Sequence, residues 1–347
     1  IMKASSTKIH SAFHRHFPRS LIVILILLSL VLAGCNLPQV LPTALPDSPQ
    51  RQTEIARILH PTEITPQAQE PTPTAGIPEL PPNQPGVNFN DQVITYTTRQ
   101  GDTLLALAVR FNVPPAAIQA ETPLSDTGLL PVGLQVQLPN ALEDFLPYHE
   151  AILPDSEVIY GPSVGGFDSI SFIHEAGGFL STYSEDVKGQ TLTGPEIVYW
   201  VSLETSTNPR LLLAFLEYRS GWVLGSPSGA AEDEFPIGYG ANDTGLYNEL
   251  MITAKLIAQG FYGWREGSLT ELTFYRGGTE RLSPALNAGS VAVMQLFANL
   301  YEKEDWVDQL IEPGEFLLFY QQMFGDYRER ALQVEPYLLA TTVEPEL

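Results

Sequence analysis

The segment from residue 94 to residue 139 constrains the fold of this 347-residue chain more than any other stretch. It opens with Ile94 to Thr98, which are β-branched or aromatic and favour a strand. A Gly-Asp-Thr turn follows, and apolar residues then recur at helical spacing from Leu104 to Phe111. A proline pair ends this helix, residues 116–120 predict a second short helix, and the alternation in residues 134–138 predicts a closing strand. We therefore expect a small α+β unit with the order βααβ.

This unit closely resembles the LysM domain, and the match covers the whole module. Thr122 departs from the family pattern, because LysM domains usually have asparagine there. The resemblance implies that residues 93–140 bind glycans containing N-acetylglucosamine, chiefly peptidoglycan. A module kept only for its compact fold is the alternative. The matching residues are Tyr96-Thr97, Gln100 to Leu104, Ala108, Arg110 to Val113, Ile118, Leu130 to Gly133 and Val136 to Pro139.

The resemblance also implies where a glycan would lie. In LysM domains a shallow groove runs between the Gly-Asp-Thr loop and the loop before the second strand. Carried onto this sequence, the glycan-binding residues are Gly101, Asp102, Thr103 and Leu104 on one side, and Thr122, Pro123, Leu129 and Leu130 on the other.

The charge balance argues against two classes of partner. The chain has 40 Asp and Glu against 18 Lys and Arg, which gives a formal net charge of −22. Such a surface repels nucleic acid and anionic lipid headgroups, so we expect neither as a partner. A single cysteine leaves no pair for an internal disulfide bond.

Residues 1–35 have the order of a secretory signal. A basic stretch, residues 2–20, precedes the apolar residues 21–32 and the small residues Ala33 and Gly34. The sequence Leu-Ala-Gly-Cys that ends at Cys35 resembles the lipobox of bacterial lipoproteins, in which the cysteine is lipidated and becomes the new N-terminus. The resemblance implies a protein that is lipid-anchored to a membrane and extracytoplasmic. An ordinary signal with a chance cysteine is the alternative.

Proline, threonine and glutamine dominate residues 36–90, a composition that cannot bury a core. We expect a disordered tether there, with a reach on the order of 170 Å if it is fully extended. Helical periodicity dominates much of residues 143–335, which predicts a mainly α-helical domain. We expect residues 336–347 to be the truncated end of a longer reading frame. The expected helices are residues 195–206, 209–222, 245–259, 287–301, 305–311 and 314–324.

One of these helices contains a candidate catalytic residue. Asn208 and Pro209 favour a helix start, and Leu211 to Leu216 are apolar around the helical circumference, which predicts burial on all sides. Glu217 follows directly. A partly desolvated carboxyl has a raised pKa, which is the property that a glycosidic general acid needs.

The same run resembles the catalytic helix of lysozyme-like lytic transglycosylases, and Asn287 to Gly289 resembles that family's Asn-Ala-Gly segment. The resemblance implies that Glu217 is the catalytic acid of a peptidoglycan-cleaving enzyme. Tyr218 and Leu286 depart from the pattern, and the Gly-Leu-Met-Gln motif is missing at its usual spacing. The alternative is that Glu217 forms a salt bridge with Arg210, Arg219 or another basic residue and caps a structural helix.

Other candidate sites are weaker. The histidines after the signal have no metal-ligand spacing, so we expect neither a metal nor another cofactor. A group of aromatic residues is able to stack on sugar faces, although such density is more typical of a core. They are Phe261, Tyr262, Trp264, Phe274 and Tyr275.

Together these patterns predict a cell-envelope lipoprotein that binds the N-acetylglucosamine-containing glycan of peptidoglycan through residues 93–140. The alternative is a lytic transglycosylase or lysozyme-like enzyme that uses Glu217 and is brought to its substrate by the LysM module.

Overall fold

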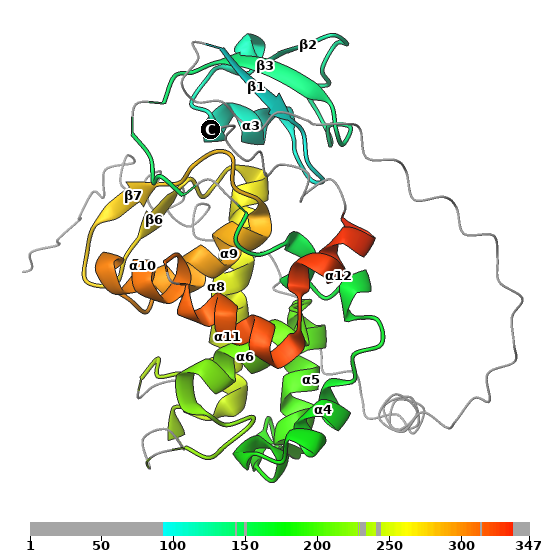
Figure 1. The fold of residues 1–347 in the computed structure, drawn as a ribbon, viewed down its shortest axis with the longest axis vertical. Coiled ribbons are helices and arrows are strands. Elements are labelled where there is room, and N and C mark those ends of the chain that lie inside the picture. The colour runs from blue at the N-terminus through cyan, green and yellow to red at the C-terminus, as the bar shows by residue number, and fades with distance from the viewer. Residues whose placement is uncertain are drawn as a thin grey trace, which may run out of the picture. The chain divides into compact units, whose positions relative to one another are not determined.

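The computed structural model describes residues 93–142, 144–148, 151–227, 229, 234–240, 244–312 and 314–335 (Figure 1). All of them belong to the second of the two units into which the chain divides, Pro78–Leu347. The expected signal, the lipidation of Cys35, the tether and the truncated tail lie outside the described residues. Among the helices that are described, none is long and apolar enough to cross a membrane.

The first elements form a small three-stranded antiparallel sheet with the strand order β1-β3-β2 and one helix. Ile94 pairs with Leu138 and Tyr96 with Val136, so alternate side chains of β1 and β3 point into one core. The elements are β1 (Val93–Thr97), α3 (Leu104–Arg110), a 3₁₀ turn (Pro115–Ala117), β2 (Gln119–Ala120) and β3 (Gln135–Pro139). The predicted strands and the first helix are confirmed as elements.

The expected second helix is wrong in type. Residues 115–117 make a single 3₁₀ turn, and the backbone becomes extended at Ile118. Gln119 and Ala120 then pair with β3 as a short strand. Forming the first turn of a helix costs conformational entropy, and a segment of five residues forms too few hydrogen bonds to offset it. The edge of β3 offers hydrogen-bond partners to the same backbone N–H and C=O groups.

The region that follows is mainly helical with small sheets, as the periodicity predicts. Each of the six expected helices has an observed counterpart, with boundaries that differ by a few residues at most except at the end of α8. The helices are α4 (Ser169–Ala176), α5 (Gly194–Thr205), α6 (Pro209–Ser220), α8 (Leu246–Glu266), α9 (Ala288–Ala298), α10 (Lys303–Leu310), α11 (Glu315–Phe324) and α12 (Tyr327–Val334).

Two antiparallel hairpins accompany the helices. They are β4 (Ser184–Val187) with β5 (Gln190–Thr193), and β6 (Glu271–Thr273) with β7 (Thr279–Arg281). The first hairpin leads directly into α5, whose N-terminus carries a complete capping box between Thr193 and Glu196.

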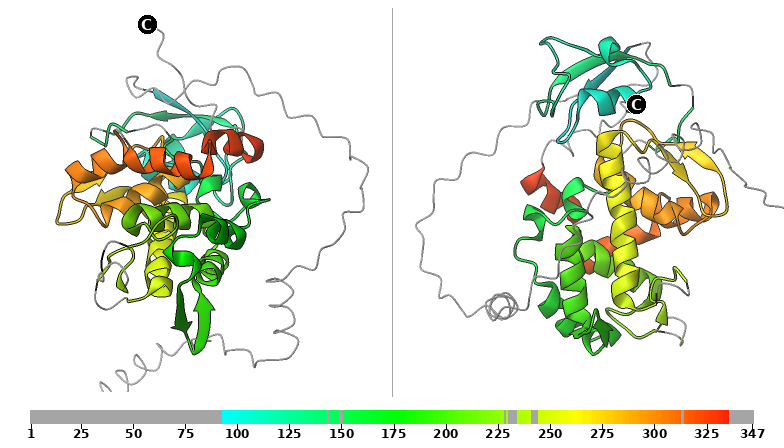
Figure 2. Two further views of the ribbon diagram at one scale, coloured as in Figure 1. Left: turned by 60° about the horizontal axis from the view of Figure 1, so that its bottom comes forward. Right: turned by 180° about the vertical axis from the view of Figure 1, so that it is seen from behind.

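The centre of this region is formed by α6, α8 and α9. Leu211 to Leu216 on α6 are fully buried, which confirms the prediction that this helix is covered on all sides. Helix α8 runs alongside α5 and also packs closely on α9 (Figure 2). Gly260 on α8 lies close to the backbone of α9, because a Cβ atom added to it would lie 2.6 Å from the Cα of Ala292.

A buried ion pair joins the two ends of the helical region. The guanidinium of Arg330 on α12 donates to both oxygens of Glu157, at 3.0 and 2.8 Å, and the Tyr320 hydroxyl donates to the same carboxylate at 2.6 Å. Glu157 is completely buried. Because each oxygen of the carboxylate is hydrogen-bonded, the charge is compensated where it lies.

Candidate functional site

The structure brings together the two loops that the LysM resemblance assigns to the glycan groove. The backbone N–H of Leu130 donates to the carbonyl oxygen of Asp102 at 2.8 Å. The loop that contains Gly101 to Leu104 therefore runs beside the loop that contains Leu129 and Leu130.

The predicted groove residues differ in how much of each is accessible. Leu129 is 68% exposed, and Thr122 and Pro123 are also exposed. Thr103 is half-buried, and its hydroxyl accepts the N–H of Ala106 as the cap of α3. The remaining predicted residues are buried, namely Gly101, Asp102, Leu104 and Leu130.

Asp102 is occupied by interactions within the protein. Its carboxylate accepts hydrogen bonds from the Tyr96 hydroxyl at 2.9 Å and from the Arg99 N–H at 2.6 Å, and it pairs with Arg110 at 2.9 Å. Burial raises the pKa of the Tyr96 phenol, and the nearby Asp102 charge adds to the rise. Asp102 therefore fixes the turn before α3, and only its backbone is placed to contribute to the groove.

Gly101 faces a side chain of the helical region. Its φ angle is +91°, and a Cβ atom added there would lie 1.8 Å from Nη2 of Arg265 at the end of α8. On the same side, Arg281 donates to the carbonyl oxygens of Val109 and Arg110 at 3.0 and 3.1 Å. The accessible part of the predicted groove is therefore the side formed by Thr122, Pro123 and Leu129.

A hollow of about 490 Å³ lies beside Thr122 on the sheet. Thr122 is the only predicted groove residue in its lining, and much of the remaining polar surface comes from three glutamines that were not predicted to bind a glycan. The alternation in residues 134–138 could have predicted the two glutamines on β3, because Gln135 and Gln137 occupy the outward positions of that strand. The lining residues are Thr95, Gln119, Ala120, Glu121, Thr122, Gly133, Leu134, Gln135 and Gln137.

Glu217, the candidate catalytic acid, closes the loop after α6. It is half-buried, and its Oε2 accepts the backbone N–H of Val223 at 2.7 Å and of Leu224 at 2.9 Å. The two arginines considered as its partners are engaged elsewhere. Arg210 donates to the Ser163 carbonyl oxygen, and Arg219 donates to the carbonyl oxygen of Ile237 and to the Tyr301 hydroxyl.

The segment that resembles the transglycosylase Asn-Ala-Gly motif is buried and hydrogen-bonded to residues 153–155. The Asn287 amide donates to the Leu153 carbonyl oxygen at 2.8 Å and to Asp155 at 2.7 Å, and the Gly289 N–H donates to the same carboxylate at 2.7 Å. Burial raises the pKa of Asp155, against the lowering effect of these hydrogen bonds. These contacts hold the chain before α4 against the start of α9.

The aromatic group between residues 261 and 275 divides into two sets. Phe261, Trp264 and Phe274 are buried, as is typical of a core, whereas Tyr262 is 46% exposed and Tyr275 is 48% exposed. Helical spacing contains the signal for Tyr262, since Phe261 and Trp264 mark the inner face of α8. Each of the two tyrosines borders a hollow that was not predicted from the sequence: Tyr275 borders a mainly polar one, and Tyr262 borders a more apolar one.

A family model described as "LasA, N-terminal domain" matches residues 151–336. No curated protein and no solved structure matches the chain.

Proposed function

Because this chain belongs to the family of the LasA N-terminal domain, whose model matches more than half of it, we propose that it is a cell-envelope protein that works at peptidoglycan. The LasA family is one of staphylolytic proteases related to peptidoglycan. The matched part is the N-terminal domain, so the proposal places the protein at the cell wall and assigns no proteolysis to residues 151–336.

In this proposal residues 93–140 are a LysM module that binds the N-acetylglucosamine-containing glycan. The observation that carries it is the hydrogen bond from Leu130 to the Asp102 carbonyl oxygen, which joins the two loops of the expected groove. The exposed Thr122, Pro123 and Leu129 are the side chains that contact the sugar. Leu129 supplies the apolar surface on which a sugar face packs.

The anchor is the second part of the proposal. Cys35 is lipidated and forms the mature N-terminus, so that the protein is held to a membrane while its folded region reaches the wall. Labelled fatty acid should enter the wild-type protein and not Cys35→Ala. Equal labelling of the two proteins would show that Cys35 is not the lipidated residue.

Retention by insoluble peptidoglycan tests the binding role. The full chain, purified in detergent, should be retained and should be released by chitooligosaccharides. Leu129→Arg should weaken retention at least tenfold, because it places a long charged side chain on the proposed sugar surface. Leu318→Arg replaces another exposed leucine, on α11, and should bind as the wild type does. Retention that the sugar does not reverse, or equal loss in the two variants, would contradict the proposed groove.

A further inference from the structure

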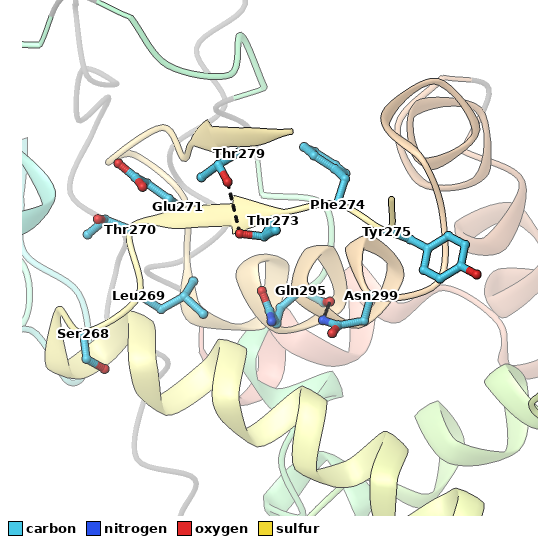
Figure 3. Close-up of a pocket in the computed structure, with 10 residues that line it drawn as sticks. All are labelled: Ser268, Leu269, Thr270, Glu271, Thr273, Phe274, Tyr275, Thr279, Gln295 and Asn299. Carbon is cyan, nitrogen blue, oxygen red and sulfur yellow. Dashed lines mark hydrogen bonds between the residues drawn. The ribbon is translucent and has the colours of Figure 1, made fainter. Parts of the chain in front are cut away.

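Two neighbouring hollows lie on the helical region, one with a mainly polar surface and the other with a more apolar one. The first, of about 580 Å³, lies between the β6–β7 hairpin and α9 (Figure 3). The second, of about 520 Å³, lies along α8. Ser268, Leu269 and Gln295 line both hollows, so the two adjoin each other. We refer to the pair as the α8–α9 groove.

The first hollow is lined by amide and hydroxyl groups from α9 and the β6–β7 hairpin. Gln295 on α9 and Asn299, which caps the end of that helix, are one turn apart, and both line the hollow (Figure 3). The side-chain amide of Asn299 donates to the backbone carbonyl oxygen of Gln295 at 2.8 Å. The hydroxyls of Thr273 and Thr279 are hydrogen-bonded to each other across the hairpin at 3.2 Å. Within the described residues, no hydrogen bond engages the half-buried side-chain amide of Gln295.

A tyrosine stands at each end of the groove. Tyr262 borders the hollow along α8, and Tyr275 forms the rim at the end of β6. The Tyr275 backbone is fixed by its N–H, which donates to the Ala298 carbonyl oxygen at 2.7 Å. Arg276 lies over the Tyr275 ring at 5.1 Å from its centroid. Both phenol rings are about half exposed although they lie beside well-packed aromatic residues.

These features match the chemistry of a neutral saccharide. Sugar hydroxyls both donate and accept hydrogen bonds, as amide and hydroxyl side chains do. The C–H face of a pyranose ring packs on the electron-rich face of an aromatic ring. Only Lys255, Glu266 and Glu271 among the lining residues carry a formal charge, so the groove offers no cationic cluster for a phosphate or a nucleic acid.

The length of the groove suits a chain of sugars. Its lining on α8 runs from Lys255 to Glu266, which corresponds to about 16 Å along the helix axis. We infer that the α8–α9 groove is a second glycan-binding site, which takes an N-acetylhexosamine oligosaccharide across Gln295, between Tyr262 and Tyr275. The inference rests on the proposed function only for the source of the saccharide, the glycan of the wall.

Binding of chitohexaose to the full chain in detergent tests this site by titration calorimetry. Each site is measured alone in a variant that blocks the other. In Leu129→Arg the remaining binding reports the α8–α9 groove, and in the double variant Gln295→Ala, Tyr275→Ala it reports residues 93–140. In the Leu129→Arg background, Gln295→Ala and Tyr262→Ala should each weaken the remaining binding at least tenfold. Tyr160→Ala, which removes an exposed tyrosine outside the groove, should not.

The outcomes separate the two sites. If Leu129→Arg binds no sugar while the double variant still does, the α8–α9 groove is not a glycan site and the proposed function stands. If the double variant binds no sugar while Leu129→Arg does, the inference stands and the LysM groove fails. A sugar-free wall peptide that binds Leu129→Arg in competition with chitohexaose would overturn the saccharide assignment. Unfolding curves that match the wild type confirm that each variant is folded.

Discussion

Carboxylate side chains in this protein repeatedly accept backbone N–H groups. Glu217 closes the turn after α6 in this way. Glu249, which is completely buried on α8, accepts the N–H groups of Ile237, Gly238 and Tyr239 at 2.5 to 3.0 Å. Such charge-assisted bonds are stronger than those between neutral groups. These hydrogen bonds explain why Glu217 can be half-buried and Glu249 completely buried in a region whose sequence pattern predicts only apolar helices.

Substitution of Glu217 separates a structural from a catalytic role. Glu217→Ala should lower the free energy of unfolding by about 1–3 kcal/mol, because two backbone N–H groups lose their acceptor. Glu217→Gln retains an oxygen acceptor, so its stability should stay closer to that of the wild type. Thermal unfolding measures both. If the wild type released anhydro-muropeptides from peptidoglycan and Glu217→Gln did not, the glutamate would be the catalytic acid instead.

Glu335 predicts a pH dependence of stability. Burial raises its pKa from 4.5 to about 7, and repulsion from Asp155 adds to the rise, while the Ser156 N–H donates to it at 2.8 Å. Between these two values the folded state binds more protons than the unfolded chain does, so the free energy of unfolding falls as pH rises. The stabilisation is complete below pH 4.5 and is lost as the pH passes through about 7.

The Glu335→Gln variant isolates this effect. Its thermal midpoint should decline less between pH 5 and pH 8 than that of the wild type, because glutamine keeps the hydrogen-bond acceptor and does not titrate. Glu329→Gln, at an exposed position on α12, serves as the matched control and should follow the wild type. Parallel pH curves for all three proteins would show that Glu335 does not control stability.

At the scale of elements, the sequence predicts best where apolar periodicity and capping residues agree. The Asn208-Pro209 start predicts α6 closely, and Asn208 does cap it through the N–H of Arg210. The pattern fails where a tertiary contact decides. Residues 119–120 become a strand because β3 offers them a partner, and short helices such as α12 depend on distant contacts, here that of Arg330 with Glu157.

The packing of α8 on α9 predicts an unusual response to a small substitution. Alanine favours a helix over glycine by about 1 kcal/mol, so Gly260→Ala would stabilise an open helix. Here the added methyl group meets the α9 backbone, with the Cα of Ala292 only 2.6 Å away. The variant should therefore lose about 1–3 kcal/mol of stability through overpacking. Denaturant unfolding measures the change, and Gln259→Ala, at the adjacent exposed position, should be near neutral. A stabilised Gly260→Ala would show that the two helices separate easily.

At the scale of the whole molecule, the candidate sites were only partly predictable. The order of residues in the LysM-like segment places its two loops together, as the Leu130 to Asp102 hydrogen bond shows. Sequence order does not show that the carboxylate of Asp102 accepts hydrogen bonds from Tyr96 and Arg110 and is therefore not available to a ligand. Nor does it show that Gln295 would line a hollow beside the β6–β7 hairpin, because that depends on how α8 and α9 pack.

Co-sedimentation of the full chain with purified peptidoglycan, at low and at moderate salt, tests the central claim most directly. The chain has a net charge of −22, and the wall is also anionic, so attraction between opposite charges is not the source of binding. A groove that holds neutral sugars should bind almost equally at both salt concentrations, because screening acts on charges. Equal sedimentation that chitooligosaccharides abolish is the predicted result. Absence of sedimentation, or its loss in moderate salt, would contradict a protein that binds the glycan of the wall.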